Sequence, residues 1–149
     1  TQTFGPVVQY SDSRVFAEFA WCVIEKKDII LHTKGQTKRS YLYTEDAVDA
    51  ILSVLIKGVS GEAYNVANEE TYCSIYEMAR LVAEKCAKNK ISVIIDENNS
   101  NDFGYAPVLH MNLDTSKLKK LGWKSTCGLQ EMFTRMIEDM REHRWLVIC

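Results

Sequence analysis

One short stretch of the sequence, residues 35–46, combines residue types that could hold a phosphorylated ligand. Gly35 lets the chain reverse direction, and residues 39–43, rich in aromatics, read as a short strand. Side chains two positions apart on a strand share a face, so we expect Arg39, Tyr41 and Tyr43 to be presented together. The guanidinium could grip a phosphate while the rings cover a sugar or base. The competing interpretation is a polar hairpin with one exposed basic residue.

The rest of the pattern predicts an α/β chain of alternating helices and strands. We expect helices over residues 15–24, 45–57, 74–87, 114–121 and 129–143. We expect strands over residues 28–33, 39–43, 62–67 and 91–95, an extended segment over 108–113, and a loop over 1–10. The helix at 45–57 is broadly apolar and should be buried on more than one side. The strand at 91–95 should be covered on both faces.

Helix starts are marked by residues that can cap exposed backbone N–H groups. Ser11, Asp12 and Ser13 are candidate caps for the first helix, and Thr44 for the second. Ser74 and Glu77 have the spacing of a capping box. Asp46 and Asp49 lie early in one helix, and we interpret them as features of solubility and of the helix dipole.

Composition limits the classes of function. The chain has 149 residues, 46% of them apolar, which is enough for one domain with a real core. Its net charge of −2 argues against broad binding to nucleic acid or to an anionic membrane. Five cysteines, odd in number and without a Cys-x-x-Cys pair, indicate reduced thiols in a cytoplasmic protein. No apolar run approaches the length of a membrane span.

Several kinds of reactive site are missing from the sequence. His32, His110 and His143 are isolated, without histidine or cysteine partners at ligand spacing, so we expect no metal site. Neither a P-loop nor a Gly-x-Ser-x-Gly elbow occurs. There is also no Gly-x-x-Gly-x-x-Gly phosphate loop and no Tyr-x-x-x-Lys pair. We therefore assign no catalytic residue to this chain.

The order of the segments resembles the C-terminal part of an extended short-chain dehydrogenase, a family of NAD-dependent nucleotide-sugar epimerases and dehydratases. The resemblance covers nearly the whole chain and rests on a series of short motifs. In chain order these are Phe4-Gly5-Pro6, Gly35-x-x-x-Arg39, Tyr43-x-x-Asp46, Gly61-Glu62-x-Tyr64-Asn65-Val66, Ser74 and Asp114-x-Ser116-Lys117-x-x-x-Leu121-Gly122-Trp123.

The resemblance implies a single portion, residues 1–149, that binds substrate and lacks the N-terminal Rossmann domain that binds NAD. It implies a small mixed α/β lobe plus a segment that would join a Rossmann sheet in the intact enzyme. The chain begins at Thr1 without methionine, as expected of a piece of a longer protein. By this resemblance no cofactor is bound by the chain itself, and NAD serves the intact enzyme.

Four residues match positions near the substrate in the resembled family. Arg39 matches an arginine that contacts the diphosphate, and Gln2 stands where an asparagine often lies near the sugar. His32 stands where an aromatic often packs, and Asn65 matches the asparagine of a Tyr-Asn pair. A second diphosphate arginine, usual before the Asp114 motif, has no counterpart here, so Lys34 or Lys38 could assist.

Two functions stay open at this point. The first is the substrate-binding portion of an epimerase or dehydratase, with a nucleotide-sugar as ligand and Arg39 as the diphosphate anchor. The second is a non-catalytic α/β binding or assembly module whose sugar-nucleotide contacts are vestigial. A homo-oligomer is possible, because the resembled family places the helix at 45–57 against a sheet that these residues lack. The base, the sugar and the reaction are not specified by the sequence.

Overall fold

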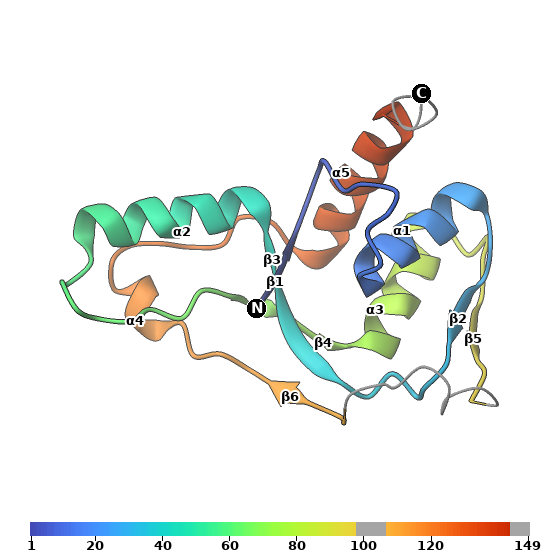
Figure 1. The fold of residues 1–149 in the computed structure, drawn as a ribbon, viewed down its shortest axis with the longest axis horizontal. Coiled ribbons are helices and arrows are strands. Elements are labelled where there is room, and N and C mark those ends of the chain that lie inside the picture. Colours follow the sequence, from blue (N-terminus) through green and yellow to red (C-terminus); the bar gives the residue numbers. More distant parts are fainter. Residues whose placement is uncertain (98–106, 144–149) are drawn as a thin grey trace.

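The computed structural model describes residues 1–97 and 107–143 as a mixed arrangement of strands and helices (Figure 1). The strands are β1 (Gln2–Phe4), β2 (Ile29–Leu31), β3 (Lys38–Tyr43), β4 (Asn68–Ser74), β5 (Val93–Ile95) and β6 (His110–Met111). The helices are α1 (Val15–Glu25), α2 (Thr44–Lys57), α3 (Ile75–Leu81), α4 (Ser116–Lys119) and α5 (Leu129–Glu142), and a π-helical segment η1 (Val82–Cys86) continues α3. The predicted mixed α/β class is confirmed.

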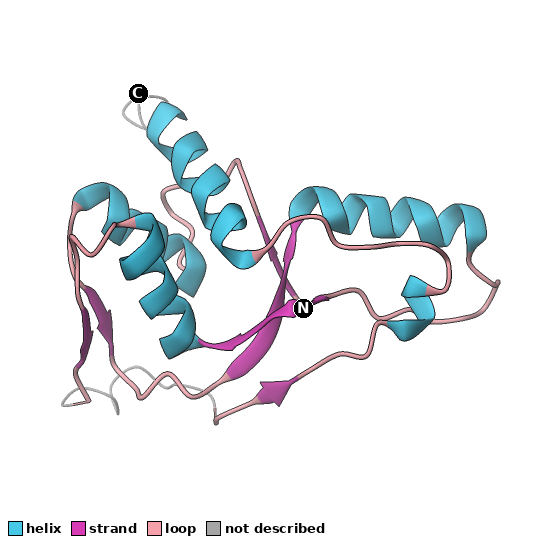
Figure 2. Cartoon of the chain, turned by 180° about the vertical axis from the view of Figure 1, so that it is seen from behind, coloured by secondary structure: helices cyan, strands magenta, loops and turns pink. Residues whose placement is uncertain are grey.

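Strand β3 is the centre of the larger sheet (Figure 2). On one edge it pairs with β4 in antiparallel orientation. On the other edge it pairs in parallel first with β6, at Lys38 and Arg39, and then with β1, from Tyr41 to Tyr43. The expectation of a loop throughout residues 1–10 was therefore wrong, because β1 is fixed by its pairing with β3. Strands β2 and β5 form a separate parallel pair.

The main core lies between α1, η1 and α5. Phe4 of β1 stacks on Phe16 of α1, with ring centroids 4.5 Å apart, and its ring centroid lies 5.1 Å from that of Phe133 of α5. The apolar stripe predicted for the last helix is confirmed. Its six buried members are Leu129, Met132, Phe133, Met136, Ile137 and Met140.

The capping predictions had mixed outcomes. The capping box is confirmed, because the Ser74 hydroxyl accepts from the Glu77 N–H and the Glu77 carboxylate accepts from the Ser74 N–H. The caps predicted for the first helix were wrong. Helix α1 starts after Arg14, which has no side-chain cap, and Asp12 instead accepts from the Arg14 backbone and guanidinium. Helix α2 likewise has no side-chain cap, and Thr44 is its first residue.

Two predicted strands differ from the structure. Residues 62–67 form no ladder with any described strand, and the following residues make β4 instead. Side chains hold this segment: the Tyr64 hydroxyl accepts from the Val59 N–H, and the Asn65 amide donates to the Asp114 carbonyl. The predicted double coverage of the strand at 91–95 was also wrong, since Ile94 and Ile95 of β5 are exposed.

Helix α2 lies apart from the other long helices, at the far side of the sheet from α1 (Figure 1). The expectation that it is buried on more than one side was wrong, because within it only Asp46 and Ala50 are buried. One side of α2, at Ala50, packs on a second small core with Leu42, Leu118 and Trp123. The exposed apolar residues of α2 are Val48, Ile51, Leu52, Leu55 and Ile56. Self-association through this face stays a prediction.

Asp46, at the start of α2, is not the solvated dipole feature that the sequence indicated. It is buried, and its carboxylate accepts hydrogen bonds from the backbone N–H groups of Thr126 and Cys127. Asp49, three residues later, is exposed as expected. Within the described residues, no helix combines the length and the apolar character needed to cross a bilayer.

Candidate functional site

Arg39 lies on β3 between two neighbouring strands, opposite Cys73 of β4 and Met111 of β6. Its side chain is half-buried, and the guanidinium makes no hydrogen bond or ion pair with any described residue. An exposed cation gains little free energy from a surface ion pair. A half-buried guanidinium on a central strand is restricted in direction, so it loses less entropy when it binds a ligand. Arg39 therefore offers a forked set of N–H donors suited to an oxyanion.

The two tyrosines predicted to accompany Arg39 do not line a ligand surface. Tyr41 and Tyr43 are 0% and 2% exposed, and both belong to the main core. The pairing of β3 with β4 shifts register between Arg39 and Tyr41, which breaks the simple alternation expected along the strand. The large apolar area of each ring favours burial over presentation. Tyr43 is instead approached by the Arg135 guanidinium, 5.3 Å from the ring centroid.

Gln2 lies beside Arg39's strand, because it pairs with Tyr41 across the parallel β1–β3 ladder. Three buried side-chain atoms at adjoining positions have no hydrogen-bond partner among the described residues: Gln2 Oε1, Ser40 Oγ and Tyr41 OH. Burial raises the pKa of Tyr41 to about 12, so its hydroxyl stays a donor at neutral pH. Unpaired buried polar atoms are costly, and these three belong to residues of β1 and β3 within two positions of Arg39 in the strand register.

The other two predicted residues lie elsewhere. Asn65 reaches the segment after β6 through its 3.0 Å bond to the Asp114 carbonyl, so its amide is already partly used. His32 follows β2, in the second sheet, and is half-buried. Gln2 is thus in register with a residue two positions from Arg39, on the strand next to it, whereas Asn65 and His32 lie elsewhere in the structure.

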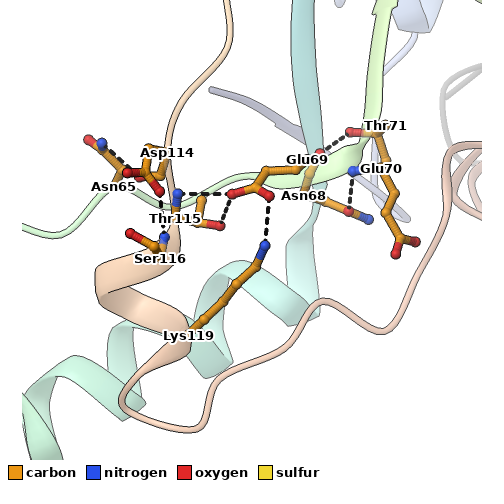
Figure 3. Close-up of polar contacts among 9 residues, drawn as sticks. All are labelled: Asn65, Asn68, Glu69, Glu70, Thr71, Asp114, Thr115, Ser116 and Lys119. Atoms are coloured by element: carbon orange, nitrogen blue, oxygen red, sulfur yellow. Dashed lines mark hydrogen bonds and ion pairs between the residues drawn. The ribbon is translucent and has the colours of Figure 1, made fainter.

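A polar cluster that the sequence did not reveal links β4 to α4 (Figure 3). The Glu69 carboxylate accepts from the Thr115 N–H at 3.0 Å and from the Thr115 hydroxyl at 2.5 Å. Its second oxygen accepts from Lys119 Nζ at 2.7 Å. These donors lower the pKa of Glu69 to about 2, with the Lys119 bond as the largest cause. Because both contacts are about 50 residues away in sequence, no local pattern could indicate them.

Because the pKa of Glu69 is lowered in the folded protein, this cluster should make the free energy of unfolding fall as the pH becomes acidic. The folded pKa of Glu69, about 2, lies below its ordinary value of 4.5, so its contribution is complete above pH 4.5 and is lost as the pH falls toward 2. Solvent screening limits that contribution to about 1 kcal/mol. We expect Glu69→Gln to lower the free energy of unfolding at pH 6 and to flatten its decline between pH 5 and 2, measured by urea denaturation.

The neighbouring Glu70 provides the matched control, because its exposed side chain makes none of these contacts. Glu70→Gln should leave both the stability at pH 6 and its acid dependence unchanged. Equal behaviour of the two variants would show that the Glu69 carboxylate contributes nothing measurable.

A pocket of about 420 Å³ opens at the segment that follows β1. Its wall is formed mainly by Gly5, Pro6, Val7, Val8 and Gln9. The remaining lining residues are mostly polar: Thr3, Phe4, Ser11, Asp12, Arg14 and Thr44. Hydroxyl, amide and carboxylate groups of this kind suit a ligand rich in hydroxyls. No pattern in the sequence indicated this pocket beyond the Gly5-Pro6 pair.

Metal and thiol chemistry find no support in the described part of the chain. No group of three or more histidine, cysteine, aspartate or glutamate side chains within it could hold a metal ion. The described cysteines are free, and burial raises the pKa of Cys22, Cys73 and Cys86 to about 11. Such thiols are poor nucleophiles at neutral pH.

Comparisons with known proteins agree with this picture. Residues 1–67 match the model of the NAD dependent epimerase/dehydratase family. The dTDP-D-glucose 4,6-dehydratase of Homo sapiens is 28% identical over 153 residues, a match that covers 97% of this chain and 41% of that protein. The chain thus spans less than half the length of this relative. The resemblance to NAD-dependent epimerases and dehydratases is confirmed.

Solved structures show the same fold. A UDP-glucose 4-epimerase from Thermotoga maritima superposes with a TM-score of 0.79 at 21% identity, over 96% of this chain and 44% of that one. A dTDP-glucose 4,6-dehydratase from Bacillus anthracis gives a TM-score of 0.75 at 18% identity, over 97% and 43% of the two chains. At these identities the likeness establishes the fold alone.

Proposed function

We propose that this chain is the substrate-binding portion of an NAD-dependent nucleotide-sugar epimerase or dehydratase, and that Arg39 holds the diphosphate of the substrate. The observation that carries the proposal is the half-buried, unpaired guanidinium of Arg39 on the central strand. The unpaired buried atoms of Gln2 and Ser40, on the paired strands β1 and β3, support a polar ligand at the same sheet. The match to the epimerase/dehydratase family supports the class of ligand.

The chemistry of the site is binding and orientation. A guanidinium can donate two parallel hydrogen bonds to the oxygens of a phosphate, and this fixes both distance and direction. Of the two lysines that could replace the missing second arginine, Lys38 already pairs with Glu77 at 3.5 Å, whereas Lys34 is exposed. Lys34 is therefore the better second cation for the diphosphate.

The residues present do not fit NAD. The sequence has no glycine-rich loop of the kind that lets a dinucleotide pyrophosphate approach a helix start, and it has no Tyr-x-x-x-Lys pair. NAD would supply hydride transfer in the intact enzyme, and we place its site outside these 149 residues. The role of this chain is to hold the sugar nucleotide in position.

A second candidate function is a non-catalytic binding or assembly module. The exposed apolar face of α2, which includes Ile51, Leu55 and Ile56, favours it, because such a face tends to be covered by another protein surface. In that case Arg39 would be a vestige without measurable affinity for nucleotide sugars.

Calorimetric titration of the chain separates these functions. We expect UDP-glucose or dTDP-glucose to bind and NAD to give no heat above dilution, because the groups for the diphosphate are present and the loop for the dinucleotide is not. Micromolar binding of NAD would mean that the cofactor site has been misplaced. Absence of binding by both nucleotide sugars would favour the assembly module.

A further inference from the structure

Val7 has a backbone conformation that its residue type disfavours. Its φ is +70°, in the left-handed region, where a β-branched residue is an outlier. Its side chain is 84% exposed, so packing of the isopropyl group does not impose this conformation. Strain of this kind persists where the surroundings fix it, and it concentrates at functional sites.

The group that fixes Val7 comes from the far end of the chain. The Val7 N–H donates to Asp139 Oδ2 of α5 at 2.6 Å, across 132 residues of sequence. A bond this short to a carboxylate is charge-assisted and stronger than one between neutral groups. The hydrogen bond thus connects Val7 to α5, and the buried apolar stripe of α5 is packed in the main core.

Asp139 has different partners for its two carboxylate oxygens, one at the end of its own helix and one outside the helix. It lies in the last turn of α5, where the helix dipole disfavours negative charge. Its side chain is 17% exposed, and each carboxylate oxygen has a partner. Oδ2 accepts from the Val7 N–H, and His143 Nδ1 lies 3.1 Å from Oδ1. Glu138, the preceding residue, is exposed and makes no such contact. Asp139, and not Glu138, is therefore the acidic residue of this turn that connects α5 to the segment around Val7.

That segment is the wall of the 420 Å³ pocket beside β1. Gly5, Pro6, Val7, Val8 and Gln9 follow one another along it, so a change in φ at Val7 would redirect the residues after it. Thr44, at the start of α2, lines the same pocket. The conformation of Val7 consequently sets the shape of a pocket lined largely by polar side chains.

We propose that Asp139 is a positioning residue: by holding Val7 in the left-handed conformation it fixes the wall of this pocket, which receives the sugar of a nucleotide-sugar ligand. The inference rests on the proposed function for the identity of the ligand. The positioning itself rests on the Val7–Asp139 hydrogen bond and on the backbone angle.

Two readouts test the proposal in the chain. Hydrogen exchange of the Val7 amide reports the bond to Asp139 directly and needs no ligand. We expect the amide to be protected in the parent and in Asp139→Asn, whose side-chain oxygen can still accept, and to lose protection in Asp139→Ala. Calorimetry with UDP-glucose and dTDP-glucose should show about tenfold weaker binding for Asp139→Ala and a smaller loss for Asp139→Asn.

A second substitution separates positioning from general damage to α5. Glycine adopts positive φ without a steric penalty, so Val7→Gly should restore much of the affinity when it is combined with Asp139→Ala. Glu138→Ala is the matched control on the same helix and should bind like the parent. A folded Asp139→Ala variant with parental affinity, or a double variant no better than Asp139→Ala alone, would overturn the proposal.

Calorimetry tests the proposed function, whereas hydrogen exchange of the Val7 amide tests the positioning role of Asp139. If the parent binds neither nucleotide sugar, the proposed function and the sugar pocket both fail. The Val7 amide still decides the positioning role: rapid exchange in the parent would overturn it, and protection that depends on Asp139 would support it.

Discussion

Replacing Asp46 with alanine is expected to lower the free energy of unfolding by about 3 kcal/mol, because it removes a buried carboxylate that accepts hydrogen bonds from three donors, one of them the buried Cys127 N–H. The carboxylate accepts from the Thr126 N–H at 3.0 Å, from the Thr126 hydroxyl at 2.6 Å and from the Cys127 N–H at 3.2 Å. Asp46 is 2% exposed and Cys127 is buried, so the Cys127 N–H in particular would be left without an acceptor. One side chain of α2 thus holds the segment that leads into α5.

The consequence of this clamp extends into the sheet. The Cys127 carbonyl accepts from the Asn68 amide of β4 at 3.0 Å, and the Asp46 carbonyl accepts from the Trp123 indole at 3.1 Å. Residues 123–127 therefore bridge α2 and β4. Loss of the carboxylate should loosen that bridge while the main core between α1 and α5 remains packed.

Urea denaturation of matched variants measures the effect. Asp49→Ala is the control, because Asp49 is an exposed residue on the same helix. Asp46→Asn should lie between the parent and Asp46→Ala, since an amide oxygen can accept some of the same bonds but brings N–H donors of its own. Equal midpoints and slopes for Asp46→Ala and Asp49→Ala would mean that the clamp adds no stability.

Local signals in the sequence were enough for the helices. The stripe of α5, with Met132, Met136 and Met140 at helical spacing, depends only on the period of the helix. The capping box at Ser74 depends on two residues three positions apart. In both cases the interacting groups lie within one turn of each other, so the pattern and the structure coincide.

Features that depend on distant partners could not be read in the same way. Strand β1 exists because Gln2 pairs with Tyr41, and Glu69 finds Thr115 and Lys119 only after the chain has folded. The helical spacing of apolar residues in α2 identified a helix, but this spacing does not show which sides of the helix are covered by other residues. At the candidate site, the alternation of residues 39–43 identified the strand that carries Arg39, whereas it could not show that Tyr41 is buried in the core.

Substitution of Arg39 should weaken nucleotide-sugar binding by about 10- to 100-fold, the effect of losing a charge-assisted hydrogen bond of roughly 1.5–3 kcal/mol. Arg39→Lys should lose nearly as much as Arg39→Ala, because an ammonium group cannot reproduce two parallel bonds. The described residues leave the guanidinium without a competing ion pair, so no internal bond has to break before ligand binds. With the second arginine of the resembled family missing, Arg39 should carry a large share of the affinity.

The measurement is calorimetric titration with UDP-glucose and dTDP-glucose at one fixed ionic strength, because salt screens contacts between charges. Arg80→Ala is the matched control: it removes an arginine of α3 that is already paired with Glu84. Lys34→Ala should cost less than either Arg39 variant, since a lysine there would add charge without direction. If both Arg39 variants bind like the parent, Arg39 is a solvated hairpin cation, and the diphosphate must be held by other residues.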